Sequence, residues 1–172
     1  MIELVLGGAR SGKSAYAESL LKRSDSNVVY IATAQAFDQE MSERILHHQL
    51  QRPAEWQLIE SPLVLAETLD SLSNSEHYLL VDCLTLWLSN HLLADESSLA
   101  AEIDRLLAVL ARVSCRVLLV SNEVGMGIVP ENRLARRFRD EAGWLNQRVA
   151  QIADKVTLVT AGMPLVLKGQ NL

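Results

Sequence analysis

The sequence predicts an α/β fold in which a mostly parallel sheet is covered by helices on both faces. Several short apolar runs lack the alternation expected of a strand with one wet face, which is typical of strands buried on both faces. Amphipathic segments of helical period lie between these runs, and such segments make the right-handed crossovers that parallel strands need. With 172 residues, we expect residues 1–172 to form a single domain.

The first strand and the first helix enclose a glycine-rich loop. The apolar run 2–6 is followed directly by GGARSGKS (7–14), which fits the pattern G-x-x-x-x-G-K-S, and then by the helical segment SAYAESLLKR. Glycines let backbone N–H groups turn toward phosphate oxygens, and the helix adds its positive N-terminal end. Lys13 would reach the outer phosphates, and the Ser14 hydroxyl would ligate magnesium. We favour this interpretation over a simple strand-to-helix turn because the strand, loop and helix signals agree.

The remaining elements follow in order along the chain. A second strand is expected at 28–32, and a helix from about Asp38 to Gln51 that ends before Pro53. Further helices are expected at about 63–72, 97–112 and 133–153, and further strands at 79–84, 117–121, 156–160 and 165–168. The last two strands flank AGMP and predict a hairpin. The predicted fold class is therefore a three-layer, RecA-like P-loop NTPase with a C-terminal β-hairpin.

Ligands in such sheets bind at the carboxyl ends of the strands. This rule gives weight to the phosphate loop, to residues 33–35, to Asp82, and to Asn122 with Glu123. Asp82 ends the apolar run YLLVD. Phosphate-loop enzymes have a carboxylate at the same place, at the end of a buried strand, where it holds magnesium. The alternative is an aspartate that caps a neighbouring loop; beside GKS, we favour the magnesium site.

Two polar segments leave alternatives open. In MSERILHHQLQR (41–52), helical spacing places His48 and Arg52 on one face and His47 about 100° away. A neutral imidazole is a competent nucleophile toward phosphorus, but this segment alone favours two solvent-facing histidines on a polar helix. Arginines also gather after the glycine loop, at Arg133, Arg136, Arg137, Arg139 and Arg148. They would bind phosphate, close a subunit contact, or form a solvated face.

Composition restricts the class of protein and its partners. A net charge of −5 and a pI near 5.4 argue against broad nucleic-acid binding. The N-terminus begins a strand rather than a signal peptide, and no apolar run approaches membrane-spanning length, so we expect a cytoplasmic protein without membrane insertion. Cys83 and Cys115 lie in or beside apolar strands without a C-x-x-C partner, which predicts buried thiols.

Several motifs together resemble one known family. GGARSGKS, YIATAQ, RILHH followed by RPAEW, and SNEVGMGIVPENRLARRFRD with NQR occur in the same order as in the bifunctional adenosylcobinamide kinases and adenosylcobinamide-phosphate guanylyltransferases of cobalamin biosynthesis. The resemblance covers nearly the whole chain, and NEVGMGIVPENR is its most specific block. It implies that ATP or GTP phosphorylates adenosylcobinamide and that GMP then passes from GTP, through a histidine, to adenosylcobinamide phosphate.

The resemblance also implies site residues and an assembly. The guanylylated histidine corresponds to His48, with Lys13 as the second catalytic residue, and Mg²⁺ is held by Ser14 and Asp82. The implied nucleotide contacts are Gly7, Gly8, Ala9, Arg10, Ser11, Gly12, Lys13, Ser14, Ala32, Thr33, Ala34, Gln49, Leu50, Gln51, Arg52, Glu60 and Asp82. Members of the family form homotrimers, which we also expect here.

Three rival functions remain. A single-step kinase for another alcohol would leave His48 inert, and a regulatory GTP-binding module would hydrolyse nucleotide to switch a partner. The absence of an N-K-x-D guanine-recognition motif disfavours the second. A DNA-dependent motor is disfavoured by the acidic balance. The choice between ATP and GTP in the kinase step, the corrinoid contacts and the general base stay open.

Overall fold

The computed structural model describes residues 1–22, 27–35, 39, 53–74 and 76–169. Its strands are β1 (Ile2–Gly7), β2 (Val28–Ala32), β3 (Gln57–Glu60), β4 (Tyr78–Asp82), β5 (Arg116–Asn122), β6 (Lys155–Thr160) and β7 (Met163–Lys168). Its helices are α1 (Lys13–Leu21), α3 (Leu65–Ser71), α4 (Leu84–Ala94), α5 (Leu99–Leu110) and α6 (Arg133–Ile152).

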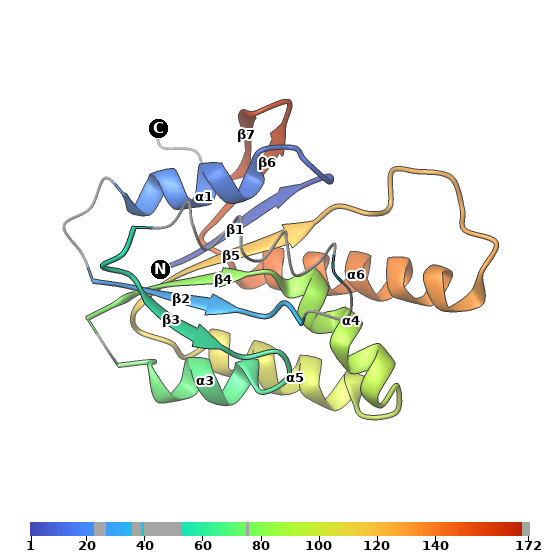
Figure 1. Cartoon of the computed structure of the whole chain (residues 1–172), viewed down its shortest axis with the longest axis horizontal. Coiled ribbons are helices and arrows are strands. Elements are labelled where there is room, and N and C mark those ends of the chain that lie inside the picture. The colour runs from blue at the N-terminus through green and yellow to red at the C-terminus, as the bar shows by residue number, and fades with distance from the viewer. Residues whose placement is uncertain (23–26, 36–38, 40–52, 75, 170–172) are drawn as a thin grey trace.

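The strands that the structure describes form one seven-stranded sheet in the order β3-β2-β4-β5-β1-β6-β7 (Figure 1). Every neighbouring pair is parallel except β6 and β7, which form an antiparallel hairpin. The mostly parallel sheet and the C-terminal hairpin predicted from the sequence are therefore confirmed. One consequence matters for the site: the carboxyl ends of the six parallel strands share one edge.

The two faces of the sheet are covered differently. Helices α3, α4, α5 and α6 lie on one face, and α1 lies on the other (Figure 1). The larger apolar cluster packs the four helices against strand residues such as Leu4 and Leu119, and it includes the fully buried Trp87 of α4. A smaller cluster packs Ala17 and Leu21 of α1 against the opposite face of the same strands. Since the strands are buried on both faces, their sequences show continuous apolar runs.

The elements α4 and β3 were not predicted from the sequence, and the predicted strand 79–84 is longer than β4 at its carboxyl end. The strand predicted at 79–84 ends at Asp82, and Leu84 already begins α4. Helix α4 lacks a clear apolar stripe because most of its residues are buried, so periodicity does not reveal it. Strand β3 is a short, mostly exposed edge strand with little apolar signal. The helix expected from about Asp38 to Gln51 falls almost wholly outside the described residues.

The burial predictions for the cysteines are confirmed, since Cys83 and Cys115 are both buried free thiols. Within the described residues, no helix combines the length and the apolar character that crossing a membrane requires.

Candidate active site

The GGARSGKS segment forms a tight loop between β1 and α1. The Ser11 amide donates to the Gly8 carbonyl at 3.2 Å, which closes the loop, and the Gly12 carbonyl accepts from the Tyr16 amide as α1 starts. Gly12 has φ 92° and Arg10 has φ 55°, so the chain twice enters the left-handed region. The backbone therefore has the geometry of a phosphate-binding loop, with a strand before it and the N-terminus of a helix after it.

Close backbone contacts hold the loop against the C-terminal hairpin. The Gly162 amide, in the β6–β7 turn, donates to the Ser11 carbonyl at 2.8 Å. A Cβ at Gly12 would lie 3.2 Å from the Gly162 Cα, and a Cβ at Gly7 would lie 2.7 Å from the Val159 carbonyl oxygen. The hairpin therefore supports the loop from behind, and two of the loop's glycines allow this close approach.

Lys13 and Asp82 lie on neighbouring parts of this edge. The Lys13 ammonium donates to the Gly8 carbonyl at 3.2 Å, folded back over the loop. Burial, together with the negative charge of Asp82, raises the pKa of the Cys83 thiol to about 12, while the positive charge of Lys13 acts in the opposite direction. Both charges are therefore near the end of β4, and Cys83 itself is a protonated, buried thiol rather than a nucleophile.

Asp82 is oriented by the neighbouring strand. Its Oδ2 accepts a hydrogen bond from the Tyr30 hydroxyl of β2 at 2.8 Å. Across the described ranges, no three His, Cys, Asp or Glu side chains are gathered as a metal site. Magnesium in nucleotide sites needs only one or two carboxylates, because phosphates and water supply the other ligands. A single strand-end carboxylate together with the Ser14 hydroxyl fits that requirement.

The other predicted contact segments on β2 and β3 end at the same edge. In the sheet register, Ala32 pairs with Asp82 on one side and with Glu60 on the other. With about 4.8 Å between strands, Glu60 lies about 19 Å from Gly7 along the edge. The buried Thr33 hydroxyl donates to the Cys83 carbonyl at 2.7 Å and accepts from its amide at 2.8 Å, so it fixes the junction between β4 and α4.

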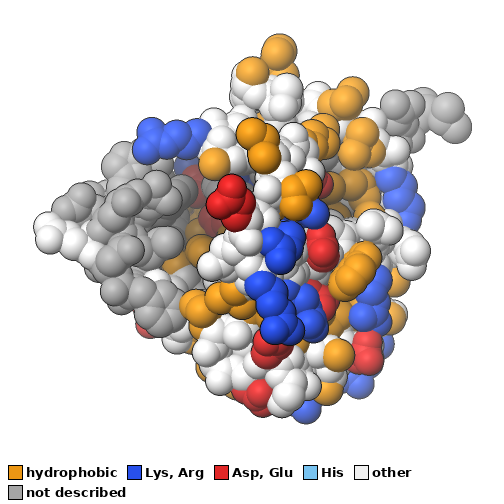
Figure 2. All heavy atoms as spheres, turned by 90° about the vertical axis from the view of Figure 1, so that its right-hand side faces the viewer, with side chains coloured by type: hydrophobic (Ala, Val, Ile, Leu, Met, Phe, Trp, Pro, Cys, Tyr) orange, Lys and Arg blue, Asp and Glu red, His pale blue; other side chains and the backbone are white. Residues whose placement is uncertain are grey.

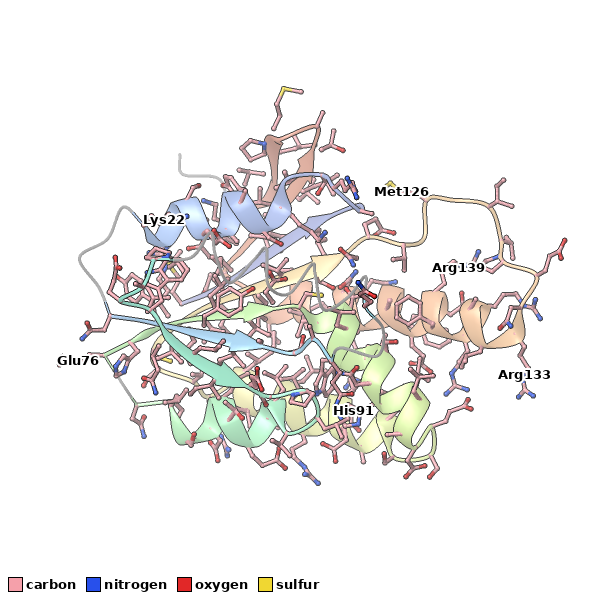
Figure 3. All side chains as sticks on the ribbon, in the orientation of Figure 1. Lys22, Glu76, His91, Met126, Arg133 and Arg139 are labelled. Carbon is pink, nitrogen blue, oxygen red and sulfur yellow. The ribbon has the colours of Figure 1, made fainter. Side chains whose placement is uncertain are left out.

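The structure also brings Asn122 and Glu123 to the phosphate loop. Gly7 pairs with Asn122 in the sheet, and the Glu123 amide donates to the Gly7 carbonyl at 3.0 Å. Glu123 Oε1 accepts from the Gly125 amide at 2.6 Å, which orients the start of the following loop. That loop carries Met126, exposed at the periphery in Figure 3. The strand-end position of both residues was the sequence signal that pointed to them.

His48 and the nucleotide contacts Gln49, Leu50, Gln51 and Arg52 lie outside the described residues, as does His47.

Most of the arginines after the glycine loop have partners in their own chain. Arg148 contacts Asp104 at 2.6 Å, and Arg137 contacts Glu141 at 2.7 Å and Glu96 at 3.0 Å. Figure 2, which faces the side where α6 begins, shows basic side chains with acidic ones beside them. These contacts favour a paired surface over an open phosphate site. Arg133 lies at the outer end of α6 (Figure 3).

The loop and the sheet define the class: this is a P-loop NTPase fold with its phosphate loop at the carboxyl edge of a mostly parallel, RecA-like sheet. Solved structures of that class resemble it. The type III secretion ATPase EscN from enteropathogenic E. coli matches 93% of this chain and 43% of its own, with a TM-score of 0.61 and 10% identity. The RadB recombinase matches 91% of this chain and 73% of its own, with a TM-score of 0.52 and 17% identity.

The chain belongs to the cobinamide kinase / cobinamide phosphate guanyltransferase family, whose model matches residues 3–167. The bifunctional adenosylcobalamin biosynthesis protein CobP of Pseudomonas aeruginosa is 52% identical over 173 residues, covering 100% of both chains. The protein CobU of Escherichia coli K12, of the same description, is 44% identical over 182 residues, covering 98% of this chain and 100% of its own. The resemblance inferred from the motifs is thereby confirmed.

Proposed function

We propose that this protein phosphorylates adenosylcobinamide with ATP or GTP and then transfers GMP from GTP to adenosylcobinamide phosphate, giving adenosylcobinamide-GDP. The observation that carries the proposal is the closed phosphate loop, with Lys13 over it and Asp82 on the same edge of the sheet. Membership of the kinase and guanyltransferase family supports both reactions.

In the kinase step, the hydroxyl of the corrinoid side arm attacks the γ-phosphorus, the bond to the bridging oxygen breaks, and the nucleoside diphosphate leaves. Such transfer depends on positioning and charge neutralisation more than on covalent protein chemistry. Loop amides and Lys13 would bind the phosphates. When bound, Mg²⁺ would be held by Ser14 and Asp82 and would neutralise phosphate charge.

The guanylyl step is proposed to pass through His48. An imidazole nitrogen attacks the α-phosphorus of GTP and pyrophosphate leaves; the phosphate of the corrinoid then attacks the same phosphorus and the P–N bond breaks. This divides one displacement into two, the usual advantage of covalent catalysis. The helical-face argument and the RILHH motif both favour His48 over His47.

The deciding experiment is incubation of the full-length protein with GTP labelled at the α-phosphate. We expect an acid-labile, alkali-stable protein adduct in the wild type and in His47→Ala, but not in His48→Ala. Because the two histidines are adjacent, the first variant is a matched control for general damage to the segment. Corrinoid phosphorylation without any adduct would support a single-step kinase instead. Nucleotide hydrolysis that does not respond to corrinoid would support a regulatory module.

We further propose a cytoplasmic homotrimer. Apolar side chains on β7, among them Leu165 (59% exposed) and Leu167 (56%), are open to solvent in the single chain. Figure 2 shows apolar side chains around the top of the molecule, where Figure 1 places the β6–β7 hairpin. Such a surface is typical of a protein contact. Sedimentation equilibrium tests this: a mass of one chain at all concentrations would exclude the trimer.

A further inference from the structure

Asn122 lies between the two groups expected to bind the phosphate chain. It ends β5, the strand between β4, which ends at Asp82, and β1, which ends at Gly7. Asp82 pairs with Val120, two residues before Asn122, and Gly7 pairs with Asn122 itself. Since paired residues and residues two apart in a strand share a face, Asp82 and Asn122 point to the same face as the phosphate loop and α1. A phosphate chain that spans the loop and Asp82 therefore passes over Asn122.

The backbone of Asn122 is fixed from the opposite face by a ring of hydrogen bonds. Its amide donates to the Thr85 hydroxyl at 2.6 Å, and its carbonyl accepts from Asn146 Nδ2 at 3.1 Å. The Ser121 hydroxyl donates to Asn146 Oδ1 at 2.7 Å, so the 3.2 Å contact between Thr85 and Ser121 has Thr85 as donor. Thr85, Ser121 and Asn146 are all buried, and together they satisfy both backbone groups of Asn122.

The Asn122 side chain, in contrast, is left without partners. Its Oδ1 is buried and makes no hydrogen bond within the described structure, and the same holds for the Ser11 hydroxyl. That hydroxyl lies against Gly7 from the loop side, 2.3 Å from where a Cβ of Gly7 would stand. The side-chain nitrogen of Asn122, Nδ2, also makes no hydrogen bond to a described residue, but unlike Oδ1 it is accessible. The Ser11 hydroxyl and the side-chain Nδ2 of Asn122 are therefore two hydrogen-bond donors without a partner in the described part of the chain.

We propose that the accessible side-chain Nδ2 of Asn122 donates a hydrogen bond to the γ-phosphoryl group and orients this group for transfer to the acceptor hydroxyl. The inference rests on the proposed kinase function. In the step, the hydroxyl oxygen forms a bond to the γ-phosphorus, the bond from that phosphorus to the bridging oxygen breaks, and the nucleoside diphosphate leaves with the electron pair. The hydroxyl proton passes to water. Thr85, Ser121 and Asn146 are positioning residues, since they act only through the backbone of Asn122.

The test compares Asn122→Ala and Asn122→Asp with the wild-type protein in two assays, cobinamide phosphorylation and labelling by α-labelled GTP. Losing one oriented donor should lower kcat for phosphorylation roughly 10- to 100-fold. The KM for nucleotide and the rate of labelling should change less than about threefold, because the γ-phosphorus does not react in that step. Asn122→Asp keeps the shape of the side chain but removes the donor, so it should lose at least as much as Asn122→Ala.

Two further variants give the comparison its controls. Asn74→Ala removes an exposed asparagine that contacts Ser114, away from the loop, and should leave kcat unchanged. Thr85→Val removes one member of the ring and should lower kcat by a smaller factor than Asn122→Ala. Equal losses in both assays with a lowered melting temperature, or wild-type activity in Asn122→Asp, would overturn the proposal. A wild-type protein that cannot phosphorylate cobinamide would instead refute the proposed function.

Discussion

Replacing Gly7 with alanine should destabilise the folded protein, whereas the same change at Gly8 should not. A Cβ at Gly7 would lie 2.7 Å from the Val159 carbonyl oxygen, a backbone atom that no rotamer change can move. At Gly8, no described atom lies within 4 Å of the added Cβ. The two residues are adjacent and belong to the same loop. A Cβ at Gly7 would also meet the Ser11 hydroxyl, but that group can turn away whereas the Val159 carbonyl cannot.

The magnitude follows from the two opposing effects of the added methyl group. Overpacking costs about 1–3 kcal/mol, and the reduced freedom of the unfolded chain offsets about 0.4–1 kcal/mol. Because the contact at Gly7 involves fixed backbone, we expect a net loss of about 2 kcal/mol there. At Gly8 only the favourable effect remains, so the free energy of unfolding should be unchanged or slightly higher.

Thermal unfolding of the nucleotide-free proteins measures the difference. For a chain of this length, about 1 kcal/mol shifts the melting temperature by about 2–4 °C, so Gly7→Ala should melt about 4–8 °C below the wild type. Gly8→Ala should melt at or slightly above the wild-type temperature. Equal melting temperatures for the two variants, or a larger loss in Gly8→Ala, would refute the proposed support of the loop by β6.

Two further stability predictions follow from burial. Arg116 pairs with Glu3, which is only 3% exposed, so Arg116→Met should cost about 2–3 kcal/mol by leaving that carboxylate without its main partner. The matched change Arg112→Met breaks a 2.6 Å pair with Asp70 in which both side chains are about half exposed, and urea unfolding should show a loss below about 1 kcal/mol. Equal losses of unfolding free energy in the two variants would show that burial does not decide how much each ion pair stabilises the protein. Burial also raises the pKa of Cys83 from 9.0 to about 12. Between these values the unfolded chain gives up a proton that the folded protein keeps, so stability falls as the pH rises, by up to about 1.4 kcal/mol per pH unit from this thiol. Urea unfolding from pH 9 upward should show a shallower decline in Cys83→Ala; parallel declines would contradict the assignment.

The sequence predicted most of the sheet because its strands are buried on both faces. Runs such as 28–32 and 117–121 have a continuous apolar pattern that few other structures produce. The same burial concealed α4: Leu84–Ala94 packs against neighbours on most sides, so it has no polar face that would mark a helix. Strand β3 was missed for the opposite reason, since an exposed edge strand of four residues has almost no apolar pattern in its sequence.

The sequence pointed to the candidate site where a motif or the end of an apolar strand marks the residue. GGARSGKS and the strand-end Asp82 both carry such a signal. The ring around Asn122 does not, because Thr85, Ser121 and Asn146 come from three elements and meet only after the sheet has formed. The hydrogen bond by which the Tyr30 hydroxyl orients Asp82 likewise joins two residues that are 52 positions apart in the sequence. Long-range polar contacts of this kind follow from topology rather than from local pattern.

A single phosphate loop serving both reactions makes a prediction that separates two residues. If one site binds the nucleotide in both steps, Lys13→Ala should weaken phosphorylation of cobinamide and also labelling by α-labelled GTP, because Lys13 is expected to hold the outer phosphates in each. His48→Ala should abolish labelling and leave phosphorylation intact, because no protein nucleophile takes part in the kinase step. Both assays are run on the same preparations, with the melting temperature as a check on folding. Normal labelling in a folded Lys13→Ala variant that has lost its kinase activity would mean that GTP binds at a second site, and the shared phosphate loop would have to be abandoned.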